Sequence, residues 1–149
     1  MSEENFVAAP PATHHVFAYG SLMYPVVWSW VVRGQYRSQP ATVKGFRRVC
    51  VDGHEHPALV VAPLAAPLTG VIYFDVGSDD LARLDHFETS NYARVLIAAT
   101  VNGDAIAAEA YLALNVEALI DRDWDVAHFE QTGLSRFLAG YATDNAPPA

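Results

Sequence analysis

The chain has 149 residues and a formal net charge of −8; 52% of its residues are hydrophobic and only 17% are charged. This length suits one domain, which can bury about two-thirds of the surface that its unfolded chain exposes. Its nine Lys and Arg residues form no basic patch. We therefore exclude nucleic acid as a partner, because phosphate backbones require clustered positive charge.

The single cysteine, Cys50, excludes an intramolecular disulfide and fits a reducing compartment. The densest apolar stretch, residues 22–32, is too short to span a bilayer. Glu3 and Glu4 stand where a secretory signal would carry Lys or Arg. These features predict a soluble, cytoplasmic protein without a membrane partner.

The folded domain is expected over residues 14–142, because residues 1–13 and 143–149 are rich in Ala, Pro and Thr and read as flexible tails. Residues 15–19 predict a buried strand that Gly20 and Ser21 interrupt. Pro25 is suited to the first turn of a short helix reaching Val32. Three more strands are predicted at residues 41–51, with a bend or bulge at Gly45, at 58–62 and at 68–76.

A helix follows, with Ser78 as its expected N-cap and with Leu81, Leu84 and Phe87 repeating at helical spacing. This helix would carry Glu88 at its C-terminal end. Next, residues 92–101 and 105–114 predict a hairpin around Asn102-Gly103, since Asn-Gly suits a type I′ turn. Residues 125–142 predict an amphipathic closing helix.

Several strands with two or three helices, which do not alternate strictly, predict an α+β domain built on a curled sheet or small barrel. The sequence shows no internal repeat, and a doubly wound fold is disfavoured.

The first candidate functional residue is Glu88. Phe87 and Tyr92 surround it with apolar bulk, and such surroundings raise a carboxyl pKa towards neutral pH. Asp85 and Arg94 are close enough in sequence to orient it or tune its pKa. The alternative is a solvated glutamate at a helix end, which is the common case.

The second candidate is the turn formed by Tyr19, Gly20, Ser21 and Leu22. A strand that ends in Gly-Ser leaves consecutive N–H groups unpaired, and these can bind a carboxylate or a developing oxyanion. Most such turns are only structural. The functional hypothesis therefore requires Glu88 and these amides to face one cavity.

Other chemistries find little support. His54 and His56, with His14 and His15, lack the further ligands that a metal site needs, so we expect no metal. Ser21 does not lie in a nucleophile elbow, because residues 19–23 read Tyr-Gly-Ser-Leu-Met. No glycine-rich phosphate loop is present, and we expect no cofactor.

Four segments taken in order resemble the γ-glutamyl cyclotransferase-like family, which includes the γ-glutamylamine cyclotransferases and their avirulence-induced plant relatives. The resemblance covers most of residues 15–141. Thr89 is a departure, since many relatives have glycine after the glutamate. The matching segments are residues 16–22, 41–48, 70–73 and 84–88 with 92–95, followed by Trp124 and the closing helix.

The resemblance implies a small mixed β-barrel with two to three helices packed outside. It implies an enzyme that converts a γ-glutamyl amine or peptide into 5-oxoproline and a free amine, without metal or cofactor. Glu88 would be the catalytic acid and base, and Tyr19, Gly20, Ser21 and Leu22, with Tyr92, would bind the small-molecule γ-glutamyl substrate. Two alternatives stay open: a non-catalytic small-molecule binding domain, and a hydrolase or transferase of γ-glutamyl amides. The sequence leaves the leaving amine and the oligomeric state undetermined.

Overall fold

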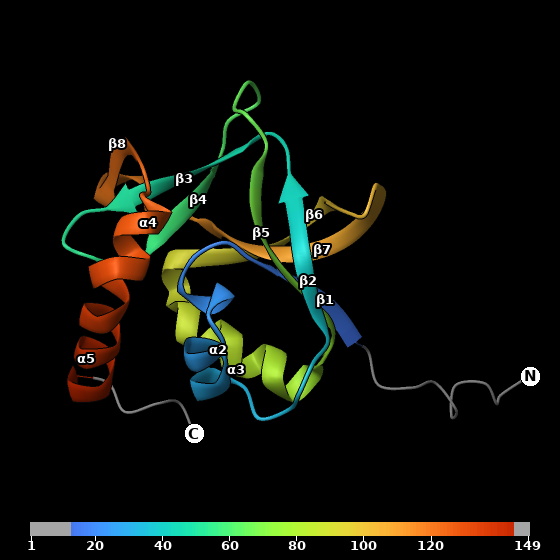
Figure 1. The fold of residues 1–149 in the computed structure, drawn as a ribbon, viewed down its shortest axis with the longest axis horizontal. Coiled ribbons are helices and arrows are strands. Elements are labelled where there is room, and N and C mark those ends of the chain that lie inside the picture. Colours follow the sequence, from blue (N-terminus) through green and yellow to red (C-terminus); the bar gives the residue numbers. More distant parts are fainter. Residues whose placement is uncertain (1–12, 145–149) are drawn as a thin grey trace, which may run out of the picture.

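The computed structural model describes residues 13–144 (Figure 1). Most of the predicted tails, 1–13 and 143–149, lie outside these residues. Thr13 begins the first strand, and residues 143–144 belong to the last helix. No helix in this described part is long and apolar enough to cross a membrane.

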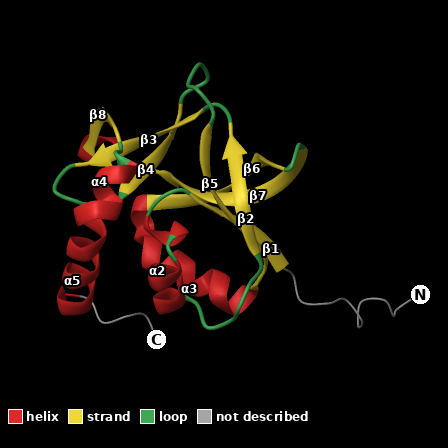
Figure 2. Ribbon diagram, viewed as in Figure 1, coloured by secondary structure: helices red, strands yellow, loops and turns green. Residues whose placement is uncertain are grey.

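Strands account for more of the described residues than helices do, and the helices are short (Figures 1 and 2). The strands are β1 (Thr13–Ala18), β2 (Ser38–Val43), β3 (Phe46–Val51), β4 (Pro57–Val61), β5 (Leu68–Gly77), β6 (Tyr92–Val101), β7 (Asp104–Ala113) and β8 (Leu119–Asp123). The helices are α2 (Pro25–Val31), α3 (Ser78–Glu88), α4 (Val126–His128) and α5 (Leu134–Asp144), with single turns at Ser21–Met23, Thr89–Asn91 and Val116–Ala118 and a π-helical turn at Phe129–Gly133.

The strands form one sheet in the order β1-β5-β2-β6-β7-β4-β3-β8, and an additional β1–β7 pairing closes its first five strands into a barrel. The β1–β7 and β4–β7 pairs are parallel, whereas β5 and β6 pair antiparallel with their neighbours. Helices α2 and α3 lie below the barrel in Figure 1, and α5 lies at its side. The predicted mixed β-barrel with helices outside is confirmed.

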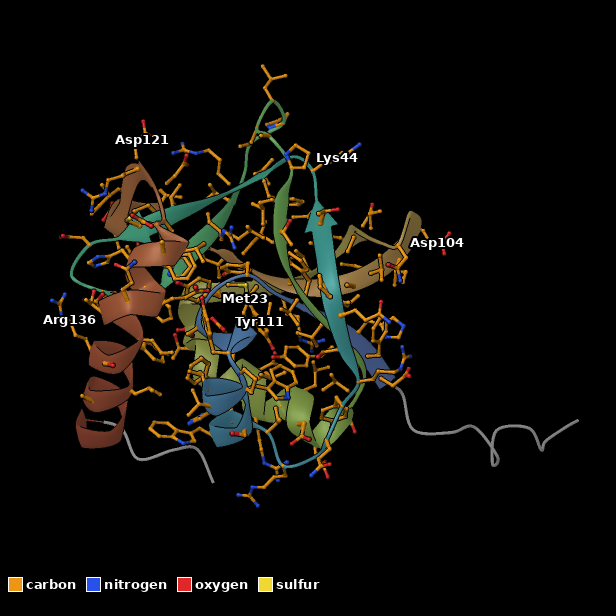
Figure 3. The ribbon with its side chains drawn as sticks, in the orientation of Figure 1. Met23, Lys44, Asp104, Tyr111, Asp121 and Arg136 are labelled. Atoms are coloured by element: carbon orange, nitrogen blue, oxygen red, sulfur yellow. The ribbon has the colours of Figure 1, made fainter. Side chains whose placement is uncertain are left out.

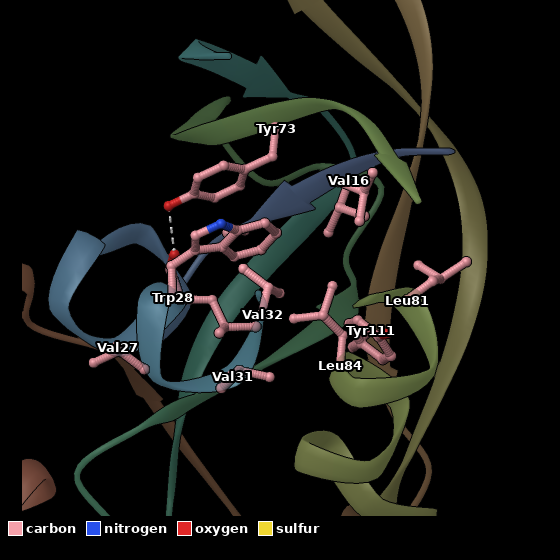
Figure 4. Close-up of a cluster of buried hydrophobic side chains, with 12 residues drawn as sticks. Val16, Val27, Trp28, Val31, Val32, Tyr73, Leu81, Leu84 and Tyr111 are labelled. Carbon is pink, nitrogen blue, oxygen red and sulfur yellow. Dashed lines mark hydrogen bonds between the residues drawn. The ribbon is translucent and has the colours of Figure 1, made fainter. Parts of the chain in front are cut away.

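Two hydrophobic clusters use opposite faces of β1. Phe17 points into the barrel with Ile72, whereas Val16 points to the helices. On the helical side Trp28 stacks on Tyr73, with ring centroids 3.6 Å apart and 2° between the planes (Figure 4). The Tyr73 hydroxyl donates a hydrogen bond of 2.8 Å to the Leu22 carbonyl oxygen. This packing fixes the segment after β1 against the barrel.

The prediction of a single strand over residues 41–51 is wrong. The structure has two strands, β2 and β3, separated at Lys44 and Gly45. Gly45 has a φ of +84°, a left-handed conformation that glycine adopts at low cost and that turns the chain out of the strand. The sequence also missed β8, which carries three charged residues in five and so lacks a strand's apolar pattern.

The helix boundaries differ in two places from the sequence prediction. Gly77, not Ser78, is the N-cap of α3, and no side chain caps this end. The expected closing helix is interrupted by the π-helical turn, which ends at Gly133, where a Cβ atom would come within 2.9 Å of the Glu55 carboxylate and the Phe129 ring. The hairpin is confirmed, with positive φ at both Asn102 and Gly103.

Candidate active site

A cavity of about 990 Å³ lies beside the barrel, where the end of β1, the end of α3 and the loop between β3 and β4 meet. All the predicted site residues line it: Tyr19, Gly20, Ser21, Leu22, Glu88 and Tyr92. The acid and the glycine-serine turn, which are far apart in the sequence, therefore face one hollow. This is the geometry that the functional hypothesis required.

Glu88 is the last residue of α3, and its side chain is half-buried at the cavity wall. Within residues 13–144, no group donates a hydrogen bond to its carboxylate. Burial raises its pKa from 4.5 to about 8, and the charge of Asp85 adds to this effect. A buried acid without a partner is costly to keep ionised, and such groups concentrate at functional sites.

A network of polar side chains holds Asp85, one turn before Glu88. The Tyr111 hydroxyl donates to Asp85 Oδ1 at 2.7 Å, and Arg94 Nε donates to the same oxygen at 2.9 Å. Arg94 also pairs with Glu109, which in turn contacts His14. The negative charge near Glu88 is therefore fixed in place from two strands. The sequence analysis expected Asp85 and Arg94 to orient or tune Glu88. In the structure Arg94 pairs with Asp85, and the charge of Asp85 raises the pKa of Glu88.

The turn after β1 presents free amide groups. The Gly20 and Ser21 carbonyls accept hydrogen bonds from Met23 N at 3.0 Å and Tyr24 N at 3.1 Å. The N–H groups of Gly20 and Ser21 have no acceptor in the part of the chain that the structure describes. Such amides are ready to bind an anionic oxygen.

Gly20 is required at this turn by a close approach. A Cβ atom at this position would lie 2.7 Å from Cδ of Pro57, closer than real Cβ contacts allow. Any larger residue would push the turn away from the β3–β4 loop, and the cavity wall would shift with it.

Three tyrosines line the cavity with Glu88. The Tyr19 hydroxyl donates to the Tyr111 carbonyl oxygen at 2.6 Å. Burial, and next the charge of Glu88, raise the pKa of both Tyr19 and Tyr92. Both hydroxyls therefore stay protonated at neutral pH. Tyr19 uses its proton in the bond to Tyr111, whereas the Tyr92 hydroxyl can donate to a ligand.

Several cavity residues were not identified from the sequence. Tyr111 reads there as an ordinary packed strand residue, and the structure places its side chain on the helical side of the barrel, with Val16 and Leu84. His54 and His56 line the cavity as well, although the sequence analysis considered them only for a metal. Within residues 13–144, no group of three or more His, Cys, Asp or Glu side chains could hold a metal ion.

Thr89, the residue that departs from the resemblance, has an unusual backbone. Its φ is +67° with a ψ of −174°, a region that non-glycine residues rarely adopt. This explains why glycine suits the position directly after the glutamate. The backbone strain at Thr89 lies directly after α3, where the chain passes the cavity.

Comparison with known proteins places the chain in a family. The sequence pattern of the family described as "Gamma-glutamyl cyclotransferase, AIG2-like" matches residues 16–126. The chain belongs to this family. The match includes Glu88 and the turn after β1, and it ends before α5.

Similar proteins include "Protein AIG2 C" of Arabidopsis thaliana, 23% identical over 88% of this chain and 81% of that protein. "AIG2-like protein D" of the same plant is 33% identical over 54% of this chain and 53% of its own length. The fold resembles an Arabidopsis thaliana solution structure with a TM-score of 0.68 and 21% identity, covering 92% of this chain and 84% of the other. It also resembles a crystal structure of an AIG2-like protein from Mus musculus, with a TM-score of 0.59 and 24% identity over 76% and 88% of the two chains.

Proposed function

We propose that this member of the family is a cyclotransferase that converts a γ-glutamyl amine or peptide into 5-oxoproline and the free amine. The proposal rests on family membership and on one observation in particular: the half-buried Glu88 carboxylate shares a cavity with the amides of Gly20 and Ser21, and none of these groups has a hydrogen-bond partner among the described residues. The "Gamma-glutamyl cyclotransferase" with a similar fold is only 16% identical, so it supports the architecture alone.

In this reaction the substrate supplies its own nucleophile. The α-amino nitrogen attacks the γ-carbonyl carbon, a new C–N bond closes the five-membered ring, and the bond to the leaving nitrogen breaks. No water is consumed. The α-nitrogen loses two protons, one from the α-ammonium group before attack and one from the ring nitrogen after it. The leaving nitrogen takes up one proton to depart as the amine and a second to become an ammonium ion. A single acid-base group can carry the first proton from one nitrogen to the other.

Glu88 is suited to this role. A carboxyl pKa of about 8 approaches that of an amino group, so a proton can pass between them at little cost. Glu88 would accept the proton from the α-ammonium group and then return it to the leaving nitrogen. Such general acid-base catalysis contributes about 10²–10⁴ in rate.

The amides of Gly20, Ser21 and Leu22 would bind the substrate, and Tyr19 would pack beside it. Binding at this turn would hold the glutamyl chain bent, with its amino group close to its own γ-carbonyl. Tyr92 lies on the same wall and would contact the glutamyl half through its hydroxyl. The shared cavity supports these assignments.

The test compares wild type with Glu88→Gln and with Glu117→Gln, a control at an exposed residue outside the cavity lining. Each purified protein is given γ-glutamyl amides, and 5-oxoproline, free glutamate and amine are measured. We expect 5-oxoproline from wild type and from Glu117→Gln, and at least about a hundredfold less from Glu88→Gln. Free glutamate would instead identify a hydrolase. Binding without any product would identify a non-catalytic binding domain.

A further inference from the structure

The end of the cavity at α5 is lined by four rings from three elements. His54 and His56 come from the β3–β4 loop, Phe137 from α5 and Phe87 from α3. Ring centroids lie 4.9 Å apart for His54 and His56, 6.2 Å for His56 and Phe137, and 6.5 Å for Phe87 and Phe137. Phe137 contacts His56 and Phe87 edge-on, so these rings are not stacked face to face.

The loop that carries the two histidines is held in place through Glu55. Its carbonyl oxygen accepts a hydrogen bond of 2.8 Å from Trp124 Nε1, and its carboxylate lies 3.8 Å from Arg136 on α5. The same carboxylate passes close to Gly133, where a Cβ atom would come within 2.8 Å of it. These contacts therefore fix the β3–β4 loop, and with it the two histidine rings, in the cavity wall.

The charged residues that line this end, Glu55 and Arg136, are paired with each other. Burial, and next the neighbouring His54, lower the pKa of His56 to about 4, so the His56 ring is neutral at neutral pH. The carboxylate of Glu55 is directed towards Arg136, which projects from α5 at the edge of the molecule (Figure 3). A cationic group placed among the rings would find the Glu55 carboxylate already paired with Arg136. An uncharged group would lose little on leaving water.

The cavity has room at this end. Gly140 lines it three residues after Phe137, so both lie on the same face of α5, and a Cβ atom at Gly140 would meet nothing within 4 Å. A volume of about 990 Å³ is at the upper end of the range for drug-sized ligands. The glutamyl half of a substrate, held between Glu88 and the turn, leaves most of this space for the other half.

We propose that the rings of His54, His56, Phe87 and Phe137 form the subsite for the leaving amine, and that it selects amines carrying an uncharged aromatic group. This inference rests on the proposed function, because continuity with the site of Glu88 defines which half of the substrate reaches the rings. The aromatic group would enter edge-on or offset against Phe137, as aromatic pairs prefer. The glutamyl half would remain the same for every substrate.

The test measures kcat/KM for three amides that share the glutamyl half: γ-glutamyl-benzylamide, γ-glutamyl-methylamide and γ-glutamyl-ε-lysine. We expect the benzylamide to exceed both others by at least about tenfold, since differences of this size arise from filling a hydrophobic pocket. Two variants then test the subsite. Phe137→Leu removes the aromatic ring and should reduce the benzylamide-to-methylamide ratio several-fold. Gly140→Leu places bulk in the open space and should reduce the same ratio without deleting any packed side chain.

Ser135→Leu is the matched control, an exposed position on α5 outside the cavity lining that should leave the ratio unchanged. Equal turnover of benzylamide and methylamide, or a preference for γ-glutamyl-ε-lysine, overturns the subsite and leaves the cyclotransferase standing. If no amide yields 5-oxoproline, the proposed function fails, and calorimetry decides the subsite independently. In that case tighter binding of benzylamide than of methylamide to Glu88→Gln supports the subsite, and equal or absent binding of both overturns it.

Discussion

Arg48 on β3 holds the carbonyl oxygen of Tyr19, the residue that begins the candidate binding turn. Its Nη1 atom donates to this oxygen at 3.1 Å and to the Thr69 carbonyl oxygen at 3.1 Å. Burial lowers the pKa of Arg48. Because a trans peptide is planar, fixing the Tyr19 carbonyl also directs the Gly20 N–H to the opposite side. Arg48 is thus positioned to orient the turn without lining the cavity itself.

Replacing Arg48 should therefore impair turnover more than folding. We expect Arg48→Met, which keeps the length and loses the donors, to lower kcat/KM for a γ-glutamyl amide by about tenfold to a hundredfold, because small misplacements of binding groups are costly. The neighbouring Arg47 pairs on the surface with Asp121 and Asp123 and provides the control. Arg47→Met should retain near-wild-type kcat/KM. Equal losses in the two variants would show that Arg48 has no special link to the turn.

The pH dependence should report the pKa of Glu88. Its carboxyl must be deprotonated in the free enzyme to accept a proton, so kcat/KM should rise with pH through about 8. Asp85 contributes to the raised pKa through its negative charge. Asp85→Asn should therefore move this rise to lower pH.

The control for Asp85→Asn is Asp104→Asn, which removes an acid at the far end of the β6–β7 hairpin and should leave the profile in place. The measurement is a kcat/KM profile between pH 5 and about 10 for wild type and both variants. A rise that stays at the same pH in Asp85→Asn would contradict the electrostatic coupling.

The sequence predicts the parts of the site that are local. Gly20 and Ser21 interrupt an apolar strand, and Glu88 ends a short amphipathic helix, so residue types and spacing identify both. The family resemblance adds that they work together. The hairpin at Asn102-Gly103 follows in the same way from turn chemistry.

The contacts that complete the site are not local. Tyr111 forms a hydrogen bond with Asp85, 26 positions away in the sequence. Glu109 contacts His14, 95 positions away. They depend on the register in which β7 lies beside β1, and that register arises only when the barrel closes. Arg48 reaches Tyr19, 29 positions away in the sequence, from β3, which pairs with β4 and β8. The alternating pattern of a strand predicts which side of the sheet each residue faces, but it does not predict which residue of another element it contacts.

Asp80 is a second acid of α3, and its role is structural. It is only 4% exposed and accepts hydrogen bonds from Arg33 N and Gly34 N at 2.8 Å and from the Tyr36 hydroxyl at 2.5 Å. Burial alone would raise its pKa, but these hydrogen bonds, with one from Arg83, hold the pKa below its ordinary value of 3.8. The acid thus joins the segment after α2 to α3.

Asp80→Ala leaves these buried donors without an acceptor, and we expect it to lower the free energy of unfolding by about 2–4 kcal/mol at pH 7. Because the pKa is lowered in the folded state, the contribution of Asp80 is present above the ordinary pKa and is lost as pH falls through the folded value. The difference from wild type should therefore shrink below about pH 4. The exposed neighbour Asp79 gives the control, since Asp79→Ala should cost less than about 1 kcal/mol. Urea unfolding at several pH values measures both variants.

Ionisation of Glu88 has the opposite effect on the free energy of unfolding, because folding raises the pKa of its carboxyl. The folded protein holds the Glu88 proton more tightly than the unfolded chain, so ionising the carboxyl disfavours folding increasingly between about pH 4.5 and 8. Glu88→Gln removes this penalty. It should be more stable than wild type at pH 8, with an unfolding midpoint higher by at least about 3 °C.

At pH 4, where the carboxyl of wild type is protonated in both states, the midpoints of Glu88→Gln and wild type should nearly coincide. For the exposed control Glu117→Gln, the difference in unfolding midpoint from wild type should not increase between pH 4 and 8. Thermal unfolding followed by circular dichroism at both pH values measures the effect. A Glu88→Gln protein that loses 5-oxoproline formation and gains stability only above pH 4.5 would connect the catalytic role of Glu88 with its effect on stability. The same desolvation makes Glu88 costly to ionise and brings its pKa near that of an amine. A Glu88→Gln protein less stable than wild type at pH 8 would mean that the ionised carboxylate has partners that stabilise it, and the raised pKa would be wrong.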